Sequence, residues 1–250
     1  MTAAMPLQNR VTPFGELVAA PARGLLFGNR GGRFHDRDAR TLRRRRWASK
    51  QWICCVLDFK GRHRAVWRTG YTELFFLDEV TALAAGHRPC CECRRLAARA
   101  FQASILHGHP GRSPRVRPLA SPRISSAESR DPPARTGAVD PGSALRAVRD
   151  DSRLMPLKEI DAHLHRERLD GRAKRRHRVS ADELPDGAVI ALDGGAFAIR
   201  GGAMRPWSLQ GYGAPRPRPS GMVDVLTPPL TLAALGGGYA PLWHPTALDE

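Results

Sequence analysis

The segment Gly86-His-Arg-Pro-Cys-Cys-Glu-Cys93 places Cys90 and Cys93 at the C-x-x-C spacing that can hold a tetrahedral metal ion. The same spacing also occurs in redox pairs and in free thiols at the start of a helix. Two further cysteines, Cys54 and Cys55, lie upstream on a predicted strand and could complete a metal site. Because adjacent residues of a strand point to opposite faces, we expect only one of these two to reach the ion.

A structural zinc ion takes four ligands, so a histidine is expected to join three cysteines. His35 is the first choice, and His63, in a predicted turn, and His87 are the alternatives. The sequence therefore predicts a single zinc ion as the cofactor. The expected ligands are Cys90, Cys93, Cys55 or Cys54, and His35.

A run of four arginines comes immediately before a segment with two tryptophans, Trp47 and Trp52. Arginine side chains contact phosphates and indole rings stack on bases, so this segment is typical of nucleic-acid binding. A solvated charge run beside two core tryptophans is the alternative. A second basic run within 170–177 would extend the same surface. The predicted phosphate contacts are Arg43, Arg44, Arg45, Arg46, Lys174, Arg175 and Arg176.

The overall charge favours a polyanionic partner. The 250 residues include 40 Lys and Arg against 24 Asp and Glu, which gives a net charge of +16 and a pI near 11.0. Such a balance attracts nucleic acid through long-range attraction and counterion release. Most of the basic residues are arginines, however, and Ala, Gly and Pro are also abundant, as in proteins from GC-rich genomes. Charge alone therefore does not decide the function.

Acidic and histidine side chains crowd a predicted helix over 157–169. Glu159, Asp161 and His165 are the candidates for acid–base chemistry there, because residues four apart share one helix face. Ordinary surface pairs on a helix give the same pattern. These residues favour, as the alternative function, a metal-dependent nuclease or phosphoesterase. The sequence has no P-loop, dinucleotide fingerprint, Gly-x-Ser-x-Gly elbow or His-Glu-x-x-His motif to support it.

A change in amino-acid composition divides the chain into two parts joined by a predicted linker. Residues 108–153 are rich in Pro, Ser, Arg and Gly without any aromatic residue, which predicts a disordered linker or insertion between 1–107 and 154–250. The first part is expected to be a small αβ module, and its predicted elements follow from β-forming runs and from the helix cap Asp78. They are strands in 24–32, a hairpin of 52–59 with 64–67, a strand over 71–77, and helices over 79–85 and 91–106.

The second part is predicted to be β-rich, either a partly open barrel or a curled sheet. A hairpin of 188–192 with 196–199 is expected around Asp193-Gly-Gly195, whose residues tolerate the positive φ that such turns need. Leu157, Ile160 and Leu164 form an apolar stripe, which predicts that the helix packs on the sheet. Further strands are expected over 204–208, 222–226 and 239–243, with a helical turn at 230–235. The fold class expected for the whole chain is α+β.

The stretch around residues 52–95 resembles the metal-binding module of the Ada DNA-repair protein, most closely in Ala82-Leu-Ala-Ala-Gly-His-Arg-Pro-Cys90. The resemblance implies a small αβ zinc module used for DNA contact, with Cys90 and Cys93 as two of four ligands. The helix-turn-helix and alkyl-acceptor segments of Ada have no counterpart in this sequence. Its methyl-transfer activity is therefore not carried over.

The combined expectation is a zinc-containing, non-catalytic nucleic-acid-binding protein, with DNA favoured as the partner. The first residues, Met1–Arg10, lack the basic and apolar regions of a signal peptide. No apolar stretch approaches the roughly 20 residues of a membrane span. These two observations predict a cytoplasmic protein with no membrane partner.

Overall fold

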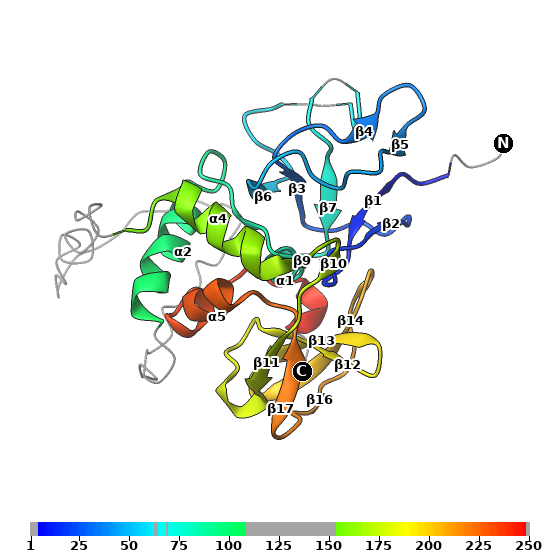
Figure 1. The fold of residues 1–250 in the computed structure, drawn as a ribbon. Helices are drawn as coiled ribbons and strands as arrows, with labels where there is room; N and C mark the ends of the chain where they lie inside the picture. The colour runs from blue at the N-terminus through cyan, green and yellow to red at the C-terminus, as the bar shows by residue number, and fades with distance from the viewer. Residues whose placement is uncertain (1–4, 63–64, 69, 109–153, 249–250) are drawn as a thin grey trace, which may run out of the picture.

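The computed structural model describes residues 5–62, 65–68, 70–108 and 154–248, so nearly all of the predicted linker lies outside the described residues. The fold is mixed α+β, as predicted, with two large sheets. Figure 1 shows the first sheet above the second, with α1 between them and the other helices along one flank. None of the helices in these ranges is long and apolar enough to cross a membrane.

The first sheet has six strands in the order β2-β1-β7-β3-β6-β8. Side chains alternate between its two faces, and Leu26, Cys54 and Leu74 lie in a buried cluster on one of them. A separate two-stranded ladder joins β4 and β5. The strands are β1 (Gln8–Val11), β2 (Leu17–Ala19), β3 (Leu26–Arg30), β4 (His35–Asp36), β5 (Thr41–Leu42), β6 (Trp52–Val56), β7 (Leu74–Phe76) and β8 (Arg88–Pro89).

The predicted hairpin between 52–59 and 64–67 is wrong. The chain does turn at Lys60 and Gly61, which both have positive φ. Strand β6, however, pairs antiparallel with β3 on one edge and parallel with β8 on the other. Because both hydrogen-bonding edges of β6 are occupied, the described residues 65–68 beyond the turn form no strand beside it.

Helix α1 (Glu79–Ala84) begins at the predicted cap, where the Asp78 carboxylate accepts from the Thr81 backbone N–H at 2.9 Å. It ends before Gly86, whose φ of +87° is the left-handed conformation that glycine adopts readily. Every residue of α1 is buried. The helix therefore lies inside the molecule, in contact with both halves of the chain.

The second sheet follows the order β11-β17-β12-β13-β14-β15, with β16 beside β14. The predicted central hairpin is confirmed: β12 and β13 pair across a turn at Asp193 and Gly194, both with positive φ. The end strands β11 and β15 do not pair with each other, so the described strands form no closed barrel. The strands are β11 (His177–Ser180), β12 (Val189–Leu192), β13 (Gly195–Arg200), β14 (Ala203–Ser208), β15 (Gly211–Tyr212), β16 (Arg216–Pro217) and β17 (Met222–Val225).

The strand predicted over 239–243 is wrong, because this segment is tied to the start of α1. The Leu242 N–H donates to the Glu79 carboxylate at 2.9 Å, and the Leu242 carbonyl accepts from the Glu79 N–H at 3.0 Å. The Tyr239 hydroxyl also donates to Glu79, at 2.6 Å. The two Leu242 bonds use the backbone N–H and carbonyl that pairing with a neighbouring strand would need. A short 3-10 helix, η3 (Pro245–Ala247), follows.

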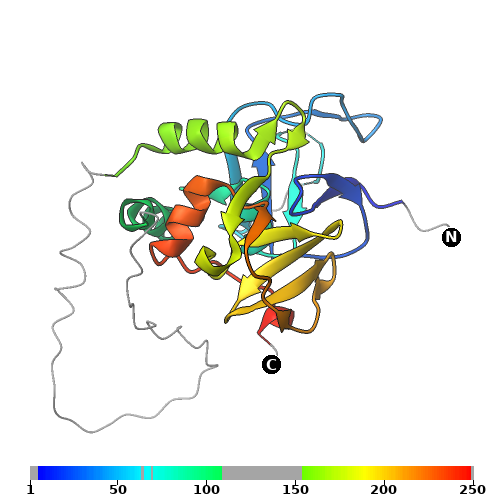
Figure 2. The ribbon, with the colours of Figure 1, turned by 60° about the horizontal axis from the view of Figure 1, so that its bottom comes forward.

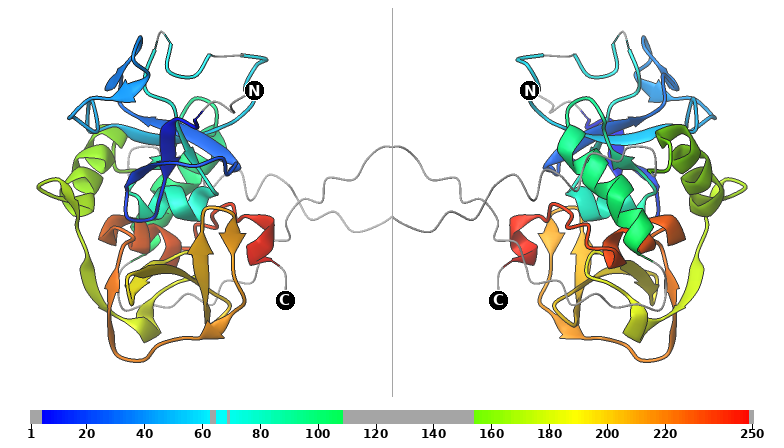
Figure 3. Two further views of the ribbon diagram at one scale, coloured as in Figure 1. Left: turned by 90° about the vertical axis from the view of Figure 1, so that its right-hand side faces the viewer. Right: turned by 90° about the vertical axis from the view of Figure 1, so that its left-hand side faces the viewer.

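Three helices pack together on the flank of the two sheets: α2 (Arg95–His107), α4 (Leu157–Arg168) and α5 (Pro229–Gly236). Figures 2 and 3 show α2 and α5 side by side. The apolar stripe of α4 does not cover a sheet as predicted, because Ile160 and Leu164 pack with Leu83, Phe101 and Ala234 of other helices. A small ladder of β9 (Leu169–Asp170) and β10 (Ala173–Lys174) continues α4, and η2 (Ala181–Glu183) follows β11.

The hydrophobic clusters combine the two predicted parts of the chain. One joins Leu77 and Val80 of the first part to Val189 and Leu226 of the second. The helical cluster around Leu83 likewise draws on both sides of the predicted linker. The boundaries 1–107 and 154–250 therefore do not separate two independent cores.

Candidate metal centre and basic pocket

Three of the predicted cysteine ligands meet in the structure. The sulfur atoms of Cys55, Cys90 and Cys93 all lie within 4.8 Å of one another. Strand β6 supplies Cys55, and the turn between β8 and α2 supplies the C-x-x-C pair. The Cys90 N–H donates to the carbonyl of Cys54 at 2.9 Å, which holds this turn against β6. The three residues could together hold a metal ion.

Cys54 faces the opposite side of the sheet, as strand alternation predicts. Its side chain is fully buried in the core, and its sulfur accepts a hydrogen bond from Arg94 at 3.2 Å. Burial raises the pKa of the Cys54 thiol, with a further increase from the nearby Glu79 carboxylate. Cys54 is therefore not part of the three-sulfur group.

The three sulfurs interact strongly. The neighbouring thiols of Cys55 and Cys93 hold the pKa of Cys90 well below its usual range, and backbone N–H groups contribute. The same contacts, together with burial, raise the pKa of Cys55. The cluster therefore favours a thiolate at Cys90, the form of sulfur that binds metal ions.

The predicted histidine ligands lie elsewhere or outside the described residues. The ring of His35 stacks on Trp67, with centroids 5.4 Å apart, and its Nδ1 lies 2.9 Å from the Thr72 hydroxyl. His87 is buried against Trp52 and Phe76. His63 lies outside the described residues. Within the described ranges, no histidine or carboxylate joins the three sulfurs.

A cavity of about 320 Å³ adjoins the cluster, and all three cysteines line it. It lies on the face of the first sheet that carries Phe27, Cys55 and Phe75, which occupy paired positions in neighbouring strands. The loop residues Phe59 and Tyr71 also line it. The candidate metal centre therefore opens onto a small aromatic cavity.

A second cavity, of about 440 Å³, is lined by six basic residues and only one acidic residue, Glu16, among the described residues. Its walls come from β3, from the segment before β6, and from the end of α4 with the β9–β10 ladder. Trp47 and Trp52 also line it. We call this cavity the basic pocket. Its basic residues are Arg30, Arg46, Arg168, Arg172, Lys174 and Arg176.

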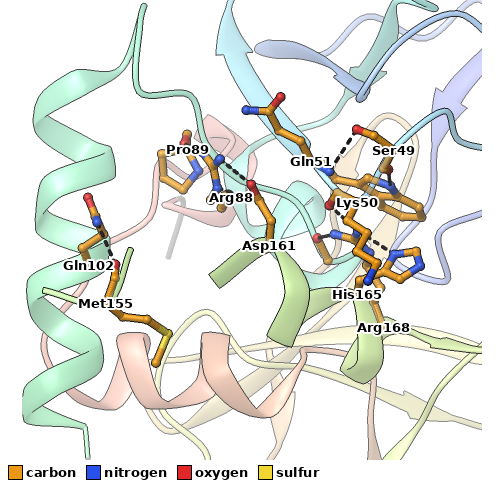
Figure 4. Close-up of polar contacts among 12 residues, drawn as sticks. Ser49, Lys50, Gln51, Arg88, Pro89, Gln102, Met155, Asp161, His165 and Arg168 are labelled. Atoms are coloured by element: carbon orange, nitrogen blue, oxygen red, sulfur yellow. Dashed lines mark hydrogen bonds and ion pairs between the residues drawn. The ribbon is translucent and has the colours of Figure 1, made fainter. Parts of the chain in front are cut away.

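Two buried arginines flank the indole ring of Trp52. The guanidinium carbon of Arg30 lies 4.0 Å from the ring centroid and that of Arg168 lies 3.8 Å from it. Arg168 donates to the carbonyls of Gly86 and Lys50 at 2.8 and 2.7 Å, and its Nε has no partner within the described structure. Figure 4 shows Arg168 beside Lys50 and His165. In the described chain, neither arginine forms an ion pair with a carboxylate.

Burial and mutual repulsion destabilise the charged forms of the basic side chains in this pocket. Burial and the nearby Arg46 lower the pKa of Arg30 to about 9, and burial and the nearby Arg30 lower that of Arg168 to about 8. Burial, with Arg168 and Arg30 nearby, also lowers the pKa of Lys174. The Lys174 ammonium donates to the carbonyl of Ala84. An anion placed among these groups would offset the repulsion.

The pocket brings together the two basic segments that the sequence singled out. Arg46, Lys174 and Arg176 of the predicted phosphate contacts line it. The rest of that set, Arg43, Arg44, Arg45 and Arg175, is exposed and does not line it. Sequence reasoning missed the central pair, Arg30 and Arg168. Arg30 lies at the end of a strand, Arg168 is one of several basic residues at the end of a helix, and nothing local marks either as buried.

The three candidates for acid–base chemistry do not converge. Asp161 forms a buried two-bond pair with Arg88, both bonds being 2.8 Å long, as Figure 4 shows. Glu159 is exposed and lies 4.0 Å from His163. His165 contacts Trp47 and Arg168 at the edge of the basic pocket. Asp161 therefore has a structural role. Glu159 faces solvent and His165 faces the basic pocket, so the three side chains do not share a site.

Comparison with known proteins adds no family. The chain matches no protein-family model, no curated protein and no solved structure. The resemblance to the Ada module thus depends on the sequence of residues 52–95 alone. The metal centre and the basic pocket are the two features of the described structure that point to a function.

Proposed function

We propose that the protein is a zinc-containing nucleic-acid-binding protein that holds phosphate groups in the basic pocket, with DNA as the favoured partner. The observation that carries this proposal is the pair of buried arginines, Arg30 and Arg168, which are 2% and 0% exposed and have no carboxylate partner among the described residues. Buried charges are normally paired, because an isolated one loses its hydration without compensation. A bound phosphate would supply the missing negative charge.

The surroundings of the pair suit a nucleic-acid strand. Arg46, Arg172 and Arg176 extend the positive charge from the pocket toward solvent, where several phosphates of one strand could be contacted. Trp47 is half-buried at the same pocket and offers an indole surface to a base. Of the segment 43–52, Arg46 and Trp47 thus lie where phosphate contact and stacking could occur together, whereas Trp52 is buried.

Zinc is the metal that we propose for Cys55, Cys90 and Cys93. Thiolate-rich sites select zinc over the hard ions magnesium and calcium. An ion bound there would link β6 to the turn before α2, and so fix the C-x-x-C pair against the first sheet. Its part in this proposal is to stabilise the fold; the nucleic acid is bound by the arginines.

The test is a salt-dependent binding titration with a short duplex DNA and with a single strand of the same sequence. In a plot of the logarithm of the binding constant against the logarithm of the salt concentration, the slope is negative. We expect the double variant Arg46→Ala, Arg172→Ala to make it less steep by about 0.9 for each duplex phosphate that the variant no longer neutralises. The matched control is Lys158→Ala, Arg95→Ala, which removes the same charge from exposed positions outside the pocket. Equal slopes for the two variants, or no complex with the unaltered protein, would refute the proposal.

A further inference from the structure

The cavity beside the cysteine cluster contains carboxylates that are already engaged. Glu73 accepts a hydrogen bond from the backbone N–H of Trp67 at 2.9 Å, and Glu92 is paired with Arg62 at 3.0 Å. Neither belongs to the group of close ligand atoms formed by the three sulfurs. Three protein ligands are fewer than the four of a closed structural zinc site. The described residues thus leave one coordination position to be filled.

From these contacts we infer that the metal ion proposed for Cys55, Cys90 and Cys93 keeps its fourth position open to the adjoining cavity, where it takes an uncharged, planar nitrogen heterocycle. This inference rests on the proposed metal and is independent of the proposed nucleic-acid binding. It assigns a small-molecule site to the face of the first sheet opposite the core. Charge and shape both select this class of ligand.

The negative charge around the proposed metal ion disfavours an anion as its fourth ligand. A divalent ion with three thiolates carries a net charge of about −1, so an anionic fourth ligand would add repulsion. Glu73 lines the same cavity and contributes a further negative charge that no arginine neutralises among the ion pairs of the described chain. A neutral donor avoids this cost. Nitrogen is the neutral donor that zinc prefers, as in the imidazole of histidine.

Shape selects a planar ring. Phe27, Phe59, Tyr71 and Phe75 line the cavity, and all four are only partly buried. Aromatic walls favour a flat aromatic ligand, through offset or edge-to-face contacts between rings. A volume of about 320 Å³ is at the lower end for ligand pockets, which suits one small ring system.

The experiment uses the full chain loaded with Co²⁺, whose visible absorption bands report the ligands around the ion. We expect imidazole to change these bands in a saturable manner, and acetate at the same concentration to leave them unaltered. We also expect Phe59→Ala to weaken imidazole binding about two- to tenfold, the range that one aromatic contact gives. The matched control is Leu248→Ala, an exposed leucine that does not line the cavity.

The outcomes separate this inference from the proposed metal. Bands that respond to imidazole and not to acetate support it. Cobalt that binds but does not respond overturns the open position and leaves the metal proposal standing. In that case, a response gained in His63→Ala would identify a protein ligand in the fourth position. A full chain that binds no cobalt refutes the metal proposal and this inference together.

Discussion

The adjacent cysteines of β6 have opposite surroundings, although they differ by one position. The Cys55 sulfur lies in the three-sulfur group, whereas the Cys54 sulfur lies in the core beside Arg94. This division follows from the alternation of side chains along a strand. It makes the pair a matched set for testing the metal centre.

We expect Cys55→Ser to lose bound zinc and Cys54→Ser to keep about one equivalent, because only the first removes a thiolate ligand. Elemental analysis of the two purified variants measures the difference. Cys54→Ser retains a small side chain beside Arg94, so it controls for the general effect of altering β6. Equal zinc contents in the two variants would contradict the assignment of Cys55.

At the residue scale, sequence reasoning succeeds where the signal is local. The C-x-x-C spacing and strand alternation together predict that Cys90 and Cys93 are joined by one of two upstream cysteines, and Cys55 is the one that lies near them. The basic pocket is only partly predictable in this way. Its buried arginines, Arg30 and Arg168, are far apart in the sequence and meet only in the folded chain, where both contact the ring of Trp52.

At the scale of elements, a buried ion pair connects α4 to the first sheet. The Arg88 guanidinium on β8 meets the Asp161 carboxylate on α4 through two hydrogen bonds of 2.8 Å, and both side chains are buried. The connection matters for the basic pocket, because the same helix ends at Arg168. Loss of the pair would leave the Arg88 charge buried without a partner.

We expect Asp161→Ala to lower the free energy of unfolding by about 3–5 kcal/mol, the usual cost of breaking a buried ion pair from one side. Urea denaturation measures this loss. The control is Glu159→Ala on the exposed face of the same helix, which should change stability by less than about 0.5 kcal/mol. A small effect of Asp161→Ala would show that α4 is held by its apolar contacts instead.

The elements that sequence reasoning placed correctly are those with a local start or stop signal. The Asp78 cap and the turn at Asp193 and Gly194 are both confirmed. The predictions that failed concern which elements contact each other. Strand β6 pairs with β3 and β8 instead of with 64–67, and α4 packs on other helices instead of on a sheet. Local chemistry specifies a turn or a cap, but pairing depends on which distant edges and faces remain free.

At the scale of the whole molecule, α1 holds the two halves together. Its residues Val80, Leu83 and Ala82 belong to three different hydrophobic clusters. Its capping residue binds the C-terminal part as well, since the Tyr212 hydroxyl and the His244 N–H donate to the Asp78 carboxylate at 2.9 and 3.0 Å. The two sheets are therefore expected to unfold as one cooperative unit.

We expect Leu83→Ala, which truncates a fully buried side chain of α1, to destabilise the protein by about 2–5 kcal/mol. Hydrogen exchange followed by mass spectrometry should show strands β6 and β13, one from each sheet, becoming less protected to the same degree. Leu248→Ala, at an exposed leucine, provides the control. Reduced protection in only one sheet would mean that the halves are independent.

The chain passes out of the described structure after Gly108 and returns at Leu154, and these two points lie on neighbouring elements. The side-chain amide of Gln102 on α2 donates to the carbonyl of Met155 at 3.0 Å, a contact visible in Figure 4. This bond joins the last helix before residues 109–153 to the first described residues after them, so α2 and the segment that leads into α4 are held together by a direct contact. A change in the length of 109–153 should therefore leave the metal centre and the basic pocket unaltered, because none of the residues that line them belongs to that segment.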